Sequence, residues 1–139
     1  MASYYHHHKK GDGFIAEKHM KDNRVEYYDI VQLSNGRRMP YILHEKNLQR
    51  QMVRYQIGPY CFLESAMSYI ISSVDYMVQA HISPIYLDEI GLLEINHQGF
   101  YHLLSKLLSK NIDLVLVVRE SLLNAVLEVF SIHKYEIIG

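Results

Sequence analysis

The sequence predicts an α/β fold, a largely parallel sheet flanked by helices, with an N-terminal antiparallel β-meander. Two observations support this fold class. Residues 85–138 alternate strand, helix, strand, helix, strand, and a further helix precedes them. Such alternation is typical of parallel strands joined by right-handed helical crossovers. Residues 11–43 are rich in β-branched and aromatic side chains broken by short turns, which favours antiparallel hairpins.

The size and composition of the chain indicate one soluble globular domain. It has 139 residues, of which 49% are hydrophobic and 21% charged. Cys61 is the only cysteine, so no internal disulfide is possible and a cytoplasmic location is expected. No apolar run approaches the ~20 residues of a membrane span. The net charge of −1 gives no support for a nucleic-acid partner.

The first ten residues lack hydrophobic periodicity. We expect residues 1–10 to be a flexible polar arm and residues 11–139 to form the single domain. The run His6-His7-His8 could bind a transition metal, but consecutive side chains seldom converge on one ion. A polar arm is therefore the favoured interpretation of this segment.

The first third of the domain is predicted to be the meander. Gly11-Asp12-Gly13 and Asp22-Asn23 are turn signals, and residues 24–33 form a strand. The Asn35-Gly36 pair that follows is typical of a type I′ hairpin turn. Residues 38–43 would be the returning strand, and Pro40 places that strand at an edge or in an irregular region.

The middle of the chain changes from strand to helix. Residues 51–60 form an extended segment that ends at Gly58-Pro59. Apolar residues then recur at helical spacing and predict a helix over residues 62–80.

The last third carries the strand–helix alternation. A short apolar strand at 85–87 is followed by an amphipathic helix beginning near Phe100. Residues 113–118 are continuously apolar, as expected of a strand buried on both faces. A third helix is predicted over about 121–130, and residues 134–138 form a last short strand.

The strongest candidate site lies where two of these strands end. Asp88 and Glu89 follow the strand at 85–87, and Arg119 follows the strand at 113–118. Because parallel strands end at the same sheet edge, the three side chains should lie together. Two acids and an arginine suit a magnesium triphosphate. The alternatives are a solvated acidic turn that caps a helix, and an ion pair between Arg119 and an acid that fixes adjacent loops.

The residues around this site resemble a known family. The run Ile-Tyr-Leu-Asp-Glu-Ile-Gly-Leu-Leu-Glu at 85–94 is similar to the Walker B segment of the small P-loop nucleoside-triphosphatase family first associated with thermophiles. Gln98-Gly99-Phe100, residues 114–120 and the earlier segment 11–17 are similar to further parts of that family, in the same order.

This resemblance implies a P-loop-type α/β fold and slow, Mg²⁺-dependent hydrolysis of nucleoside triphosphates with little base preference. By position, Asp88 would be the metal-side acid and Glu89 the base that activates water. Arg119 would stabilise charge on the transferred phosphoryl group.

One part of the family pattern is absent. Family members begin with a strand, a Gly-x-x-x-x-Gly-Lys-Ser/Thr loop and a helix, and no such loop occurs in this sequence. That loop binds the phosphates, so we expect weak or no catalysis by this chain alone. A protein partner or a homo-oligomer is expected to cover the missing first strand and helix. The alternatives are a composite site completed by another chain and a non-catalytic binding or regulatory module.

Overall fold

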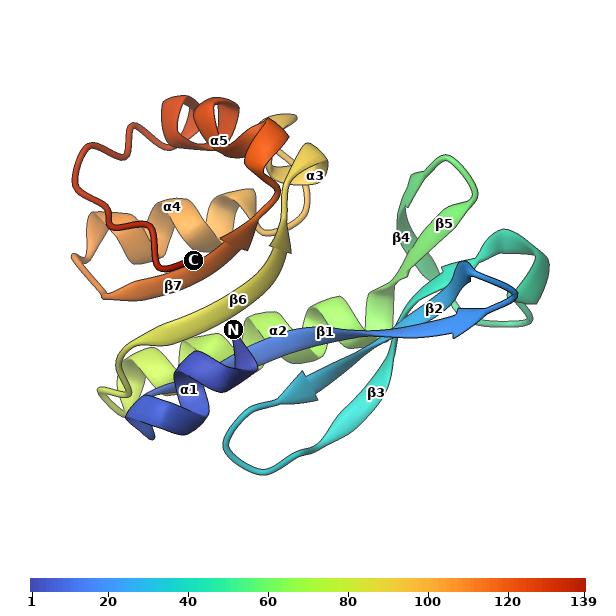
Figure 1. Ribbon diagram of the computed structural model, residues 1–139, viewed down its shortest axis with the longest axis horizontal. Helices are drawn as coiled ribbons and strands as arrows, with labels where there is room; N and C mark the ends of the chain where they lie inside the picture. Colours follow the sequence, from blue (N-terminus) through green and yellow to red (C-terminus); the bar gives the residue numbers. More distant parts are fainter.

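The structure is a computed structural model that describes residues 1–139, and it contains one seven-stranded sheet with helices packed on it (Figure 1). The strand order is β4-β5-β3-β2-β1-β6-β7. The strands are β1 (Asp12–Lys21), β2 (Arg24–Gln32), β3 (Arg38–His44), β4 (Val53–Ile57), β5 (Tyr60–Leu63), β6 (Ile85–Ile90) and β7 (Leu114–Val118). The helices are α1 (Ala2–His8), α2 (Glu64–Gln79), α3 (Leu92–Ile95), α4 (Tyr101–Ser109) and α5 (Leu123–Val129), with 3₁₀ turns η1 (Glu45–Asn47) and η2 (Glu120–Leu122).

The α/β fold with an N-terminal meander is confirmed, but the sheet is mixed and not largely parallel. Only β1·β6 and β6·β7 are parallel pairs. The pairs β1·β2, β2·β3, β3·β5 and β4·β5 are antiparallel. For β1·β2, β2·β3 and β4·β5 the reason is the length of the connections, because a short turn can only return a strand antiparallel to the one before it.

The meander differs from the expectation in its turns. The two-residue hairpin turn is Asp22-Asn23, where both residues have positive φ angles of 52° and 62°. A type I′ turn requires positive φ at both positions. The Asn35-Gly36 pair instead lies in a five-residue loop between β2 and β3, and only Gly36 has a positive φ. The β2·β3 pairing is irregular opposite Pro40, in agreement with the sequence.

Strand β1 joins the two halves of the sheet. The sequence predicts a turn at Gly11–Gly13, but Asp12 begins β1 and Gly13 pairs with Tyr86 of β6. A Cβ atom on Gly13 would lie 2.0 Å from the Tyr86 carbonyl oxygen. The glycine therefore permits close approach of two strands. Asp12 is buried and accepts hydrogen bonds from Gly13, from the Gln32 side chain and from both the backbone and the hydroxyl of Ser34.

The predicted long helices are confirmed. Helix α2 packs against β1, β3 and β5, and its apolar stripe is buried: Ala66, Met67, Ile70, Val74 and Met77. Helix α4 buries Leu103, Leu104 and Leu107. The third predicted helix consists of η2 followed by α5. None of the helices is long and apolar enough to serve as a membrane span.

Two predictions for the last strands are wrong. Residues 114–118 form the end strand of the sheet and are not buried on both faces; Val117 is 39% exposed. Residues 134–138 form no strand, and the side chains of Tyr135, Ile137 and Ile138 are exposed. An apolar sequence favours a strand without fixing how many neighbours it has.

The first ten residues also differ from the expected polar arm, because residues 2–8 form the short helix α1. The rings of Tyr4 and Tyr5 lie against Tyr86, with centroid separations of 6.2 and 5.5 Å. His8 stacks on Tyr4 at 3.9 Å. The helix thus packs on β6 through aromatic side chains.

The close approach of β1 and β6 gives the first testable prediction. Gly13→Ala should lower the free energy of unfolding by about 2–4 kcal/mol, because the new methyl group overlaps the Tyr86 carbonyl and the strands must separate. Urea denaturation measures this change.

The matched control is Gly36→Ala. The φ angles of Gly13 and Gly36 are both positive, at 155° and 71°, but no atom lies within 4 Å of a Cβ added at Gly36, so only the backbone strain of about 1 kcal/mol applies there. If both variants lost the same free energy of unfolding, close packing at Gly13 would not be a constraint.

Candidate functional site

The two adjacent acids lie within β6, between β1 and β7. The sequence places the end of the strand at Leu87, but the structure continues it to Ile90, which pairs with Val118 of β7. The β6·β7 ladder is irregular between Leu87 and Ile90, and Glu89 has a φ of 60°. A left-handed backbone is unusual for a residue other than glycine and is concentrated at functional sites.

Asp88 is held by two backbone groups. Its Oδ2 atom accepts a hydrogen bond of 2.9 Å from the Ala16 N–H of β1, and its Oδ1 atom accepts one of 2.7 Å from the Glu89 N–H. Burial raises the pKa of Asp88, and these two hydrogen bonds oppose that rise. Each carboxylate oxygen keeps a second lone pair, so the group is oriented and can still accept a ligand.

Glu89 is also partly buried. Burial raises the pKa of Glu89, and the charge of Asp88 adds to the rise, while Arg119 and Lys18 act in the opposite direction. The two neighbouring acids therefore resist ionising together.

Arg119 lies directly after β7, at the edge of the sheet where Asp88 and Glu89 lie, because β6 and β7 are parallel. Its charge lowers the pKa of Glu89. Arg119 forms no ion pair within 4.0 Å. The alternative interpretation, in which it pairs with an acid and fixes adjacent loops, is therefore wrong. The guanidinium is exposed.

Glu94 organises the loop behind the acids. It is 2% exposed, and its two oxygens accept hydrogen bonds from the N–H groups of Gly91 (2.7 Å) and Phe100 (2.9 Å). Burial raises the pKa of Glu94, and these hydrogen bonds oppose the rise. A Cβ atom on Gly99 would lie 2.1 Å from the Glu94 Oε2 atom, which explains the glycine there. The last Glu of the motif at 85–94 is therefore structural.

Two buried tyrosines near the acids could not be found from the sequence. Burial raises the pKa of Tyr28 on β2 and of Tyr41 on β3, and the charges of Glu89 and Asp88 contribute to both shifts. These residues lie more than 40 positions before Asp88 in the sequence. No spacing pattern links them to the acids, because they lie on other strands of the sheet and β1 stands between those strands and β6.

The donor set at this edge fits Mg²⁺ only in part. Nowhere do three His, Cys, Asp or Glu side chains gather as a metal site would require. Mg²⁺ commonly binds through one or two carboxylates, and water and phosphate oxygens complete its shell. Asp88 can supply such a carboxylate, so this edge fits a metal that arrives with a nucleotide.

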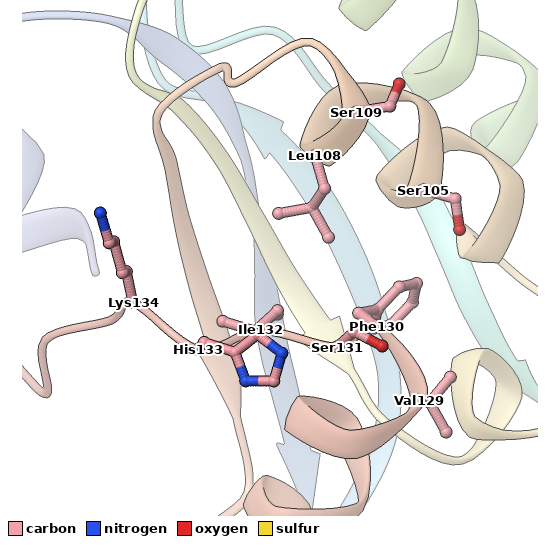
Figure 2. A pocket seen from close by; sticks show the side chains of 9 residues that line it. All are labelled: Ser105, Leu108, Ser109, Val129, Phe130, Ser131, Ile132, His133 and Lys134. Atoms are coloured by element: carbon pink, nitrogen blue, oxygen red, sulfur yellow. The ribbon is translucent and has the colours of Figure 1, made fainter.

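Two hollows lie away from the acids. Figure 2 shows the first, of about 430 Å³, between α4 and the segment after α5; Ser105, Ser109 and Lys134 are among its lining residues. The second, of about 630 Å³, lies between the β1–β2 turn and residues 44–47. Asp88, Glu89 and Arg119 line neither hollow.

The role of Glu94 can be tested directly. Glu94→Gln should lower the free energy of unfolding by about 1–3 kcal/mol, because an amide offers one acceptor oxygen and leaves the N–H of Gly91 or Phe100 without a partner. Urea denaturation measures the loss. The control is Glu128→Gln on the exposed surface of α5, which should change stability by less than about 0.5 kcal/mol. An equally small effect at both positions would contradict the structural role of Glu94.

Comparison with known proteins agrees with this architecture. A search of curated proteins gave no match. Among solved structures, a human cancer-related nucleoside triphosphatase is similar in fold, with a TM-score of 0.53 and 21% sequence identity over 91% of this chain and 74% of that chain. A family model described as NTPase matches residues 4–138, which is nearly the whole sequence. The chain therefore belongs to the NTPase family, the small P-loop nucleoside triphosphatases that the motif at 85–94 resembles.

Proposed function

We propose that this protein binds a nucleoside triphosphate as its Mg²⁺ complex at the carboxyl ends of β6 and β7, and hydrolyses it slowly. The observation that carries the proposal is the pair Asp88–Glu89, near the end of an interior strand of an NTPase-family chain. The similarity in fold to a nucleoside triphosphatase supports the same substrate class.

Asp88 is the metal-side carboxylate in this proposal. The N–H groups of Ala16 and Glu89 hold it in one orientation before any ligand arrives. Asp88, directly or through water, and the phosphates would hold Mg²⁺, which supplies charge neutralisation at the phosphate oxygens when bound. Because the carboxylate is already fixed by hydrogen bonds, little side-chain entropy is lost on binding.

Glu89 is the base that orients and deprotonates the attacking water. A general base works best when its pKa is close to the working pH, and the raised pKa of Glu89 moves it in that direction. Because the backbone of Glu89 is left-handed, its side chain leaves the strand in a different direction from that of a regular strand residue.

Arg119 stabilises negative charge that develops on the phosphoryl group during transfer. It is exposed and engaged in no ion pair, so its donors are available to a ligand. Its influence on the pKa of Glu89 supports its place beside the reacting groups.

The phosphate side of the reaction limits this activity. The sequence holds no Gly-x-x-x-x-Gly-Lys-Ser/Thr loop, whose amides and lysine would bind the β- and γ-phosphates. Each missing charge-assisted hydrogen bond is worth about 1.5–3 kcal/mol, so affinity and rate should both be low. Nucleotide binding without turnover would indicate a non-catalytic binding module, or half of a site that another chain completes.

We also propose that residues 11–139 act as one domain with residues 1–10 appended, and that the protein works in the cytoplasm. The single cysteine, Cys61, is buried and unpaired, as suits a reducing compartment.

The role of Glu89 is tested with the full chain and Mg²⁺ together with ATP or GTP. We expect weak binding by calorimetry and slow phosphate release for the wild-type protein. Glu89→Gln should lower phosphate release by about 10²–10⁴-fold and leave nucleotide binding unchanged, because the base is lost and the metal-side acid remains. The wild-type rate should rise with pH as Glu89 ionises, with the midpoint above the ordinary pKa of a glutamate.

Glu128→Gln serves as the control for the loss of one carboxylate, and it should leave both binding and rate unchanged. Unchanged turnover in Glu89→Gln would reject Glu89 as the base. No binding at about millimolar nucleotide would reject the proposed nucleotide site as a whole.

A further inference from the structure

Lys18 on β1 is a cation beside the candidate site that has no acidic partner. Its side chain is exposed and forms no ion pair within 4.0 Å. Two residues before it on the same strand, the Ala16 N–H donates to the Asp88 carboxylate over 2.9 Å. A lysine ammonium group stands on a flexible four-carbon stem and carries three donors. It can therefore approach a ligand that is bound at Asp88.

Lys18 belongs to the face of the sheet that packs against α2. Side chains alternate between the two faces along a strand, so Phe14, Ala16 and Lys18 share one face. Phe14 is buried on that face, with its ring 5.7 Å from the ring of Tyr69 on α2. Tyr28 of β2 stands directly opposite Lys18 in the β1·β2 pairing and is also buried. Residues that pair directly across two strands lie on the same face, so Lys18 extends this face beyond its apolar part.

The charged groups of the candidate site act on the same face. Burial raises the pKa of Tyr28, the charge of Glu89 adds to that rise, and the charge of Arg119 opposes it. Burial also raises the pKa of Glu89, and Arg119 and Lys18 are the two cations that oppose this rise. Because Tyr28 stands opposite Lys18, the lysine, the arginine and the acid surround the same part of the sheet.

The residues on either side of Lys18 in the sequence are engaged on the other face of the sheet. Arg38 donates two hydrogen bonds, of 2.6 and 3.0 Å, to the carboxylate of Glu17. The Nε2 atom of His19 lies 3.1 Å from the carboxylate of Asp29. The charged groups of that face therefore have partners within the chain. Lys18 has none, so its ammonium group is available to a ligand.

Lys18 and Arg119 stand on opposite sides of the acids. The strand order β1-β6-β7 places β6 between the strand that carries Lys18 and the strand that Arg119 follows. The β1·β6 pairing ends at Phe14 and Leu87, and beyond these residues the two strands diverge (Figure 1). A Mg²⁺ ion neutralises only part of the charge of a triphosphate, so further cations are needed around it.

We propose that Lys18 binds the phosphate chain of the nucleotide from the side of β1, while Arg119 approaches the transferred phosphoryl group from the side of β7. The ammonium group of Lys18 donates charge-assisted hydrogen bonds to phosphate oxygens that Mg²⁺ does not hold. This inference rests on the proposed function, because it requires a triphosphate at the acids. Lys18 contacts phosphates in this arrangement and makes no contact with the nucleoside.

The experiment measures the Kd of the full chain for two probes, ATP and inorganic triphosphate, each with Mg²⁺. Calorimetry at low ionic strength keeps the screening of charges small. Lys18→Met removes the charge and keeps the length of the side chain. It should raise the Kd of both probes by the same factor, about tenfold or more, because the probes share only the phosphate chain. Lys18→Arg keeps the charge and should stay within about threefold of the wild type.

Lys10→Met is the matched control. Lys10 is also exposed and forms no ion pair within 4.0 Å, but it precedes β1 and so lies at the far end of that strand from Lys18. Its replacement removes the same charge from the chain and should leave both Kd values unchanged. Far-ultraviolet circular dichroism verifies that each variant is folded.

The outcomes separate this inference from the proposed function. If the wild type binds both probes and Lys18→Met binds them equally well, the role of Lys18 is overturned and the proposed function stands. A loss for ATP alone also overturns it, because Lys18 would then act on the nucleoside, and so does an equal loss in Lys10→Met. A wild-type protein that binds neither probe overturns the nucleotide site, and the role of Lys18 with it.

Discussion

The parallel contact between β1 and β6 is the constraint on which the rest of the structure depends. It joins the antiparallel meander to the strands that alternate with helices, and it requires Gly13 because any side chain there would overlap the Tyr86 carbonyl. The same contact brings the Ala16 N–H onto Asp88, 72 positions away. Asp12 fixes the start of β1 by accepting hydrogen bonds from the β2–β3 loop. The orientation of the candidate site therefore follows from the packing of one strand pair.

Three carboxyl groups within seven residues define the electrostatics of this region: Glu94 is buried, and Asp88 and Glu89 are partly buried. Burial raises the pKa values of Asp88, Glu89 and Glu94, but the groups are satisfied differently. Glu94 uses both oxygens to hold a loop, and Asp88 is oriented by two N–H groups. The side chain of Glu89 makes no hydrogen bond to another residue of the chain. Glu94 is therefore structural and Asp88 is oriented before any ligand binds, and the free carboxylate of Glu89 is the reason that we propose it as the reactive acid.

The sequence was sufficient wherever a local pattern decides the structure. Helices α2 and α4 follow from apolar stripes at helical spacing, and the Asp22-Asn23 turn follows from residues that tolerate positive φ. The motif at 85–94 was enough to indicate the family that the family model then matched.

The rest depends on contacts that no local pattern records. The run at 114–118 reads as a strand, but its position at the end of the sheet depends on what lies beside it. The glycines at 11 and 13 read as a turn, although Gly13 serves the approach of a strand distant in sequence. No local pattern indicates that the charges of Asp88 and Glu89 contribute to the raised pKa values of Tyr28 and Tyr41, which lie on β2 and β3.

The central claim, that Asp88 near the end of β6 holds the metal of a nucleotide complex, is tested most directly by NMR with Mn²⁺ in place of Mg²⁺. The paramagnetic ion broadens the signals of nearby amides. We expect the amides of Ala16, Glu89 and Gly91 to broaden first, and only when a nucleoside triphosphate is present. Broadening that is confined to His6–His8, or that is the same without nucleotide, would contradict the account.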